Sequence, residues 1–136
     1  MRVNQLAQAV GVTPDTVRFY TRVGYLEPTK NPANGYKDYD DKNLRRLQFI
    51  LSARQLGFSV EDIGSILAES DEGKSPCPLV RQLIERRLRE HEQRFNETVL
   101  LRNRMLAAVE QWSTKGDKQP TGHMICHLIE EFTHEP

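Results

Sequence analysis

The sequence predicts a mainly α-helical protein, with a compact helical domain first, one long helix after it and a short C-terminal segment. Apolar side chains recur at three- and four-residue spacing over most of the 136 residues. Glycine and proline gather in a few short stretches that separate these patterns, and neither occurs between Leu79 and Trp112. We therefore expect a domain over 1–70, a linker over 71–78, a long helix over 79–112 and a loop with a tail over 113–136.

The first two helices are predicted to be short and to lie close together. Asn4 can cap a helix that carries Leu6 and Val10 on its apolar face and ends at Gly11. Thr13 can cap the second helix through its hydroxyl, and the proline that follows gives up no useful N–H at the first helical position. Because so few residues join the two helices, they have no room to separate, which indicates a helix-turn-helix.

The second helix and the ribbon after it carry basic and aromatic side chains. A turn rich in asparagine, proline and glycine over 31–35 leads into a tyrosine- and lysine-containing segment. A short capped helix followed by such a ribbon is what a winged helix-turn-helix offers to a DNA groove and its flanking phosphates. The candidate DNA contacts are Thr13, Thr16, Arg18, Tyr20, Arg22, Asn34, Gly35, Tyr36, Lys37 and Tyr39.

Two further helices are expected to complete the core of this domain. Asp40 or Asp41 can cap the first of them, which ends near Gly57. Ser59 and Asp62 have the spacing of a capping box at the start of the second. The basic side chains that can still reach phosphates at the margin are Arg45, Arg46 and Arg54.

These motifs resemble the DNA-binding domain of the MerR family of transcriptional regulators. The matching segments are Val17-Arg18-Phe19-Tyr20, Gly24-Tyr25-Leu26 and Gly35-Tyr36-Lys37-Asp38-Tyr39. The sequence departs from the family pattern at Phe19, at Thr21 where glutamate is frequent, and at Lys37 where arginine is usual. Lysine keeps the charge but loses the bidentate fork, so it suits a phosphate better than a base.

The long helix is predicted to need a partner. Its seam positions are Ile84, Leu88, His91, Phe95, Thr98, Arg102, Met105, Val109 and Trp112, of which six are apolar. A helix of about 34 residues spans about 50 Å, more than a domain of this size covers, so the seam favours a homodimer. Charged residues beside the seam are expected on its solvated face: Glu85, Arg86, Arg87, Arg89 and Glu90. The resemblance implies an antiparallel coiled coil between two protomers.

The two cysteines flank this helix. In an antiparallel dimer, Cys77 of one chain falls beside Cys126 of the other, and two thiolates with an imidazole suit Zn²⁺ and also Cd²⁺, Pb²⁺ or Hg²⁺. The resemblance strengthens this hypothesis, since divalent-metal sensors of the family carry a cysteine at the position of Cys77. A second cysteine of the family's loop is absent here. His123 is the first candidate for the third ligand, His127 the second and Asp117 the third, with an external ligand also open.

Charge balance and the absence of several sequence patterns limit the classes of function that this protein can have. Basic and acidic residues both number 19, so DNA affinity must come from local placement of charge. The sequence shows no membrane-length apolar run and no signal-peptide pattern, which predicts a cytoplasmic protein. It shows no nucleophile elbow, phosphate loop or carboxylate–histidine constellation, so no enzyme is expected.

Two regulatory hypotheses remain. The first is a metal-responsive regulator, with zinc as first choice. The resemblance implies that it binds a pseudo-palindromic operator and distorts the promoter so that RNA polymerase can engage it. The alternative is a sensor of oxidants or electrophiles, which would react through Cys77 or Cys126 on the same scaffold.

Overall fold

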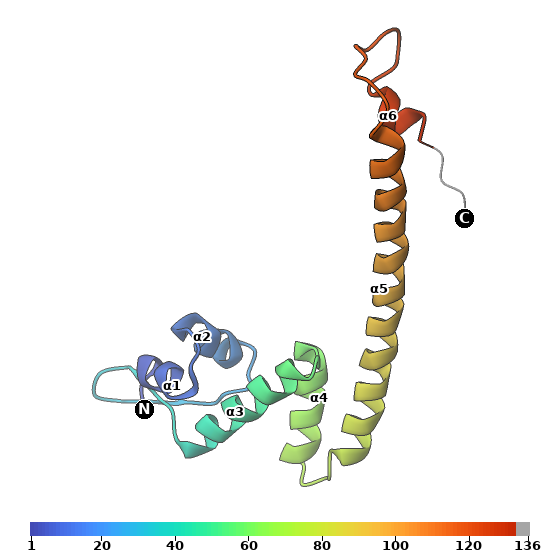
Figure 1. Cartoon of the computed structure of the whole chain (residues 1–136). Helices are drawn as coiled ribbons and strands as arrows, with labels where there is room; N and C mark the ends of the chain where they lie inside the picture. The colour runs from blue at the N-terminus through green and yellow to red at the C-terminus, as the bar shows by residue number, and fades with distance from the viewer. Residues whose placement is uncertain (133–136) are drawn as a thin grey trace. The chain divides into compact units, whose positions relative to one another are not determined.

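The computed structural model describes residues 1–132, which form two compact units over 1–87 and from residue 88 onward. The fold is mainly helical, as predicted (Figure 1). The first unit holds α1 (Val3–Val10), α2 (Pro14–Arg22), β1 (Thr29–Lys30), β2 (Lys37–Asp38), α3 (Asp41–Gln55) and α4 (Val60–Asp71). The long helix α5 (Cys77–Trp112) starts in the first unit and continues into the second, which also holds α6 (His127–Glu130). Among the described residues, no helix combines the length and apolar character needed to cross a bilayer.

Three of the four predicted helix caps are present. The Thr13 hydroxyl accepts the Thr16 N–H at 3.3 Å, and the Asp40 carboxylate accepts the Asn43 N–H at 2.9 Å. The capping box of α4 is complete and is described with the site below. The prediction of Asn4 as the cap of α1 is wrong. That helix begins at Val3, and the Gln5 side chain accepts the Arg2 N–H at 2.9 Å, so Asn4 lies inside the first turn.

The core of the first unit joins all four short helices to the start of α5. Leu6, Val17, Leu47 and Ile63, one from each short helix, are fully buried. Leu83 of α5 is buried in the same cluster, and three more α5 side chains pack against it: Leu79, Val80 and Ile84. The predicted role of α3 and α4 in completing the core is confirmed. The first turns of α5 belong to this core as well.

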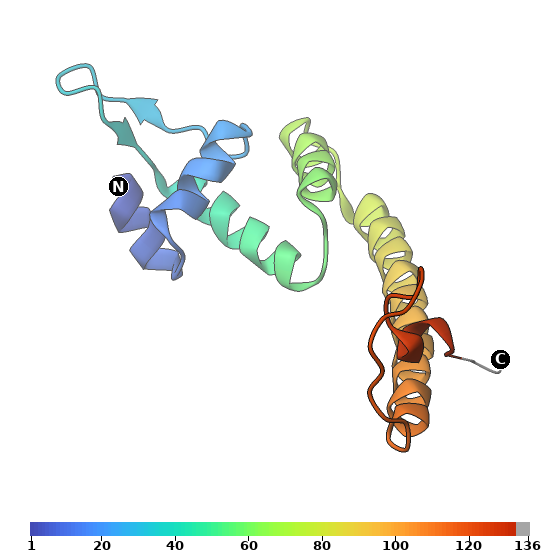
Figure 2. The same cartoon turned by 90° about the horizontal axis from the view of Figure 1, so that it is seen from above.

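The ribbon between α2 and α3 is a two-stranded antiparallel hairpin, visible as two arrows in Figure 2. Thr29 pairs with Asp38, and Lys30 pairs with Lys37. Gly35 closes the turn with a φ of 71°, a conformation that glycine adopts without strain, and its N–H donates to the Asn31 carbonyl at 2.8 Å. The predicted wing is therefore present, with exposed residues along both of its strands.

The second unit is built around the end of α5. The Trp112 indole N–H donates to the Leu128 carbonyl at 2.9 Å, and its ring meets Phe132 edge to face. His127 is buried, and its Nε2 lies 2.9 Å from the Gly116 carbonyl oxygen. These contacts hold the loop after α5 and the short helix α6 against the last turn of α5.

Candidate functional site

Helix α2 presents its basic side chains to solvent from a firmly capped start. At the helix N-terminus the hydroxyls of Thr13 and Thr16 lie within hydrogen-bond distance of each other, at 3.0 Å, and the Thr13 hydroxyl also accepts the Thr16 N–H. Arg18 is exposed and pairs with Asp15 at 2.9 Å within the helix. Arg22 is exposed at the other end of the helix, with its guanidinium 5.8 Å from the Phe19 ring centroid. The helix can therefore offer two cations and two hydroxyls to a polyanion.

Two candidate contacts lie in the core instead. Tyr20 is 6% exposed and Tyr39 is 2% exposed. Tyr20 packs against the rings of Phe19 and Tyr25, and the Tyr39 hydroxyl lies 2.7 Å from that of Thr21. Buried rings cannot stack on or line a groove, so we assign both tyrosines a packing role that holds α2 and the wing together.

The wing supplies a second exposed group. Its candidate residues Asn34, Gly35, Tyr36 and Lys37 are all exposed. The Asn34 side chain accepts the Tyr36 N–H at 3.0 Å, which shapes the turn. Tyr36 is 57% exposed, so a large part of it is accessible to a partner.

The arginines of α3 have mostly internal partners. Arg46 bonds both carboxylate oxygens of Asp71, at 2.7 and 3.3 Å, and donates to the Tyr25 carbonyl at 2.7 Å. Arg54 donates to the Phe58 carbonyl at 2.8 Å. Arg45 is exposed on the same helix. Of the three, Arg45 is best placed to reach a phosphate, while Arg46 and Arg54 hold neighbouring segments in place.

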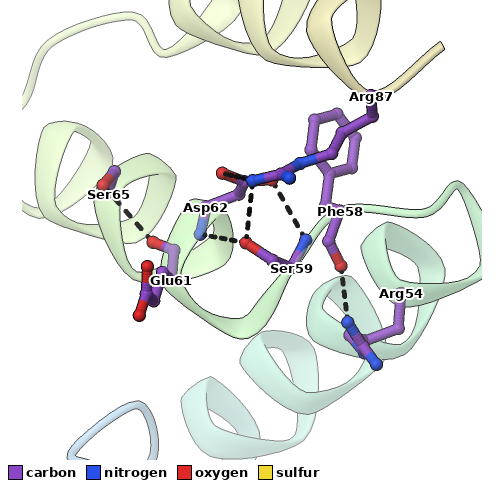
Figure 3. Close-up of polar contacts among 7 residues, drawn as sticks. All are labelled: Arg54, Phe58, Ser59, Glu61, Asp62, Ser65 and Arg87. Carbon is purple, nitrogen blue, oxygen red and sulfur yellow. Dashed lines mark hydrogen bonds and ion pairs between the residues drawn. The ribbon is translucent and has the colours of Figure 1, made fainter. Parts of the chain in front are cut away.

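Arg87 is not on the solvated face of α5, and that prediction is wrong. Its Nε donates to Asp62 Oδ2 at 2.6 Å and its Nη2 to Oδ1 at 2.8 Å, with a further bond to the Ser59 hydroxyl at 3.3 Å (Figure 3). Asp62 and Ser59 also exchange bonds with each other's backbone N–H at 3.0 Å, which completes the predicted capping box. The Arg87 guanidinium, aided by the Ser59 bonds and against the effect of burial, lowers the pKa of Asp62 to about 2.

A signal for this contact was present in the sequence. Arg87 follows Val80, Leu83 and Ile84 at helical spacing, and these three pack into the core of the first unit. A side chain on that face is directed toward α4. The position of α4 beside it could be known only from the fold.

The predicted metal ligands are divided between the two units. Cys77, the first residue of α5, is an exposed free thiol of the first unit. Cys126 is a half-buried free thiol in the second unit, and His123 is exposed in the loop before it. Asp117 is also exposed. Within residues 1–132, no three acidic, cysteine or histidine side chains gather into a metal-binding group.

His127, the second candidate for the third ligand, is held within the protein. Its ring is 4% exposed and bonds the Gly116 carbonyl through Nε2. Its Nδ1 has no hydrogen-bond partner and lies 3.6 Å from the Glu131 carboxylate. One ring nitrogen is therefore engaged in closing the loop, which favours His123 over His127 as a ligand.

The backbone around Cys126 is held by hydrogen bonds to one carboxylate. The N–H groups of Ile125 and Cys126 both donate to the Glu130 carboxylate, at 3.0 and 2.8 Å. These two bonds hold the start of α6, and Cys126 is a free thiol. Cys77, Cys126 and His123 offer thiolate and imidazole donors, the ligand types that suit a borderline-to-soft divalent ion.

Comparison with known proteins agrees with the sequence motifs. A model described as MerR HTH family regulatory protein matches residues 1–70, and one described as MerR, DNA binding matches residues 44–108.

Two relatives from Haemophilus influenzae match most of the chain. One is named HTH-type transcriptional regulator ZntR homolog; it is 27% identical and the match covers 97% of both chains. The other is named a probable heavy metal-dependent transcriptional regulator; it is 29% identical over 88% of this chain and 92% of its own. Both names describe regulators of transcription, not enzymes.

A solved structure shows the same fold. The transcription regulator PbrR691 from Ralstonia metallidurans CH34, crystallised in complex with lead(II), superposes with a TM-score of 0.75 at 21% identity. The superposition covers 96% of this chain and 98% of that one. With the winged helix-turn-helix, the long helix and the matches over residues 1–108 taken together, the chain belongs to the MerR family of helix-turn-helix regulatory proteins.

Proposed function

We propose that the protein is a metal-responsive transcriptional regulator that binds promoter DNA as a homodimer and changes the shape of that DNA when a divalent metal binds. The observation that carries the proposal is the presence of two free thiols, Cys77 at the start of α5 and Cys126 just before α6, in a chain whose first 70 residues match a MerR helix-turn-helix model. The name of the heavy metal-dependent relative supports the same class of signal.

The DNA-binding part of the proposal depends on exposed polar groups of α2 and the wing. Helix α2 would enter the major groove, where Arg18 and the threonines at its N-terminus reach the DNA. Lys37 and Tyr36 of the wing would contact the flanking backbone. A two-fold dimer presents two such sets and therefore reads a pseudo-palindromic operator.

The dimer part depends on the exposed apolar face of α5. Three exposed apolar side chains of α5, Leu100, Leu101 and Met105, lie elsewhere around the helix. At about 100° per residue, the other five fall within a stripe about 80° wide, together with His91 and Arg102. The five are Leu88, Phe95, Val99, Leu106 and Val109, each 39% to 68% exposed in the single chain. Ile84 and Trp112, at the ends of the predicted seam, have contacts within the chain instead. Ile84 packs against the core of the first unit, and the Trp112 indole N–H donates to the Leu128 carbonyl. A second α5 helix packed antiparallel on the stripe would cover it.

An antiparallel pair of α5 helices would assemble the metal site. The start of one helix would lie beside the end of the other, so Cys77 of one protomer would meet Cys126 of its partner. Two thiolates and the His123 imidazole would hold the ion, with zinc as the first choice among Zn²⁺, Cd²⁺, Pb²⁺ and Hg²⁺. When bound, the ion supplies a crosslink between the two chains.

That crosslink would act as a switch because it favours one arrangement of the dimer. The first turns of α5 pack in the core of the DNA-binding unit, so a restraint on α5 is a restraint on that unit. A ligand that prefers one arrangement stabilises the DNA deformation that goes with it. The deformed promoter is the form that RNA polymerase would engage.

The test compares wild-type protein with Cys77→Ser and Cys126→Ser. Each is titrated with Zn²⁺, Cd²⁺, Hg²⁺ and Cu⁺ in competition, with metal per protomer and transcription from a selected promoter as readouts. We expect divalent ions to bind the wild-type dimer, and each single substitution to abolish both binding and response. Tight binding of Cu⁺ with an unchanged response in Cys77→Ser would contradict the proposal.

The second candidate function, a thiol-based redox sensor, uses the same two cysteines. A peroxide titration under metal-free conditions separates the two functions. If peroxide alone switches transcription in the wild type, and the divalent ions do not, the redox function is correct. Arg18→Ala serves as the DNA-binding control, because it should weaken operator binding and leave metal uptake unchanged.

A further inference from the structure

A pocket of about 270 Å³ lies where the start of α1, helix α2 and the wing meet. Its lining residues are Arg2, Val3, Asn4, Arg18, Tyr36 and Lys37. Arg18, Tyr36 and Lys37 belong to the predicted DNA interface. Arg2, Val3 and Asn4 do not, and of these the sequence analysis considered only Asn4, as a helix cap.

Arg2 is held in this pocket by contacts on three sides. The preceding residue, Met1, exchanges two backbone bonds with Tyr39, each 2.7 Å long, so the chain start runs along the end of the wing. The Arg2 N–H is fixed by the Gln5 side chain. Its guanidinium lies 4.3 Å from the centroid of the Tyr36 ring, within cation–π distance. The cation therefore occupies a defined place beside the wing.

The pocket has the chemical character of a binding site for a DNA backbone. Arg2, Arg18 and Lys37 place three cations around it, and no carboxylate is among its lining residues. Asp15 neutralises part of the charge of Arg18 from outside the pocket. Val3 and the Tyr36 ring add apolar surface. A phosphodiester joined to a deoxyribose is complementary to this pocket, because its anionic phosphate suits the cations and the carbon atoms of its sugar suit the apolar surface.

We propose that this pocket binds one backbone phosphate of duplex DNA and that Arg2 makes the contact, in addition to the helix and wing residues. The proposal rests on the proposed function, because it assigns one more contact to the same interface. It places the start of α1 on the DNA as a third element beside α2 and the wing. Each protomer of the dimer contributes one such contact.

The rival explanation is that Arg2 only packs against the Tyr36 ring and so stabilises the conformation of the wing. Charge and shape separate the two explanations. Arg2→Lys keeps the positive charge but loses the planar stacking on the ring. Arg2→Gln loses the charge and keeps a polar side chain of moderate length. A phosphate contact survives the first substitution, whereas a stacking role survives neither.

The experiment measures fluorescence anisotropy of a labelled random-sequence duplex against KCl concentration, because phosphate contacts are independent of base sequence. Each lost contact should reduce the slope of log K against log salt by about 0.9. Arg2→Gln therefore lowers the slope of the dimer by about 1.8 and the affinity at 0.1 M salt by about 60-fold. Arg2→Lys keeps the wild-type slope. Arg89→Gln, which removes an exposed cation of α5, is the matched control.

The outcomes separate the inference from the proposed function. A wild-type slope for Arg2→Gln, or equal losses for Arg2→Gln and Arg2→Lys, overturns the phosphate pocket and leaves DNA binding intact. A wild-type protein that binds no duplex at low salt overturns the proposed function itself. Far-UV circular dichroism of each variant verifies that slopes are compared between folded proteins.

Discussion

Replacing Arg87 with alanine removes the ion pair that joins the start of α5 to α4. The Asp62 side chain is only 7% exposed and the Arg87 side chain 24%, so water has little access to the carboxylate of the pair. The pKa of Asp62 is about 2, against 3.8 for an ordinary aspartate. One pKa unit corresponds to about 1.4 kcal/mol, so the contacts that lower the pKa stabilise the fold by about 2 kcal/mol at neutral pH.

The stability contributed by the Arg87–Asp62 ion pair is expected to decrease as the pH falls. The pKa of Asp62 is lower in the folded state, so its contribution is fully present above about pH 4 and disappears as the pH falls toward about 2. Arg87→Ala leaves a buried carboxylate whose pKa rises. The difference in unfolding free energy between wild type and variant should therefore be about 2 kcal/mol at pH 7 and should shrink below about pH 4.

Urea unfolding followed by far-UV circular dichroism measures both quantities. Protein concentration must be equal in all samples, because association of protomers adds to stability. Arg86→Ala is the control, since Arg86 is the exposed neighbour on the same helix and should change stability by less than about 0.5 kcal/mol. A loss that is as large at pH 2 as at pH 7 would show that the aliphatic stem of Arg87 matters, and that the ion pair does not.

Three further substitutions test local features of the fold. Gly64→Ala should cost about 1–3 kcal/mol in urea unfolding, because the new Cβ would meet Tyr25 Cζ at 2.9 Å and displace a hydroxyl bonded to the α4 backbone. Thr13→Ala should cost about 1 kcal/mol in the same assay through loss of the α2 cap, and Thr13→Ser should restore it. Trp112→Phe removes the bond to the Leu128 carbonyl. We expect faster amide hydrogen exchange in residues 113–126 while exchange in α1–α4 stays unchanged.

Local features of the fold were predictable because they depend on residues a few positions apart. The Thr13 cap and the Ser59–Asp62 capping box each close over three residues, so spacing alone identifies them. The wing followed from a turn that needs glycine at a positive φ, here Gly35. The cap of α1 was the exception, since a glutamine side chain took the place expected for Asn4.

The candidate interface was predictable in part. The pattern of α2 placed cations on the helix, and the exposed positions of Arg18 and Arg22 agree with it. The pattern could not distinguish an aromatic residue that faces DNA from one that faces the core. Tyr36 is exposed and Tyr39 is buried, although both belong to the same short motif.

The helical content, three of the four helix caps, the wing and the family were already specified by the amino-acid order, because periodicity and short-range hydrogen bonds are properties of neighbouring residues. Contacts between distant segments depended on the tertiary structure. Arg87 lies 25 residues from Asp62, and Met1 lies 38 residues from Tyr39. Which side chains share a buried face, and which cations remain free for a partner, depends on how the helices pack, and no spacing along the chain encodes that.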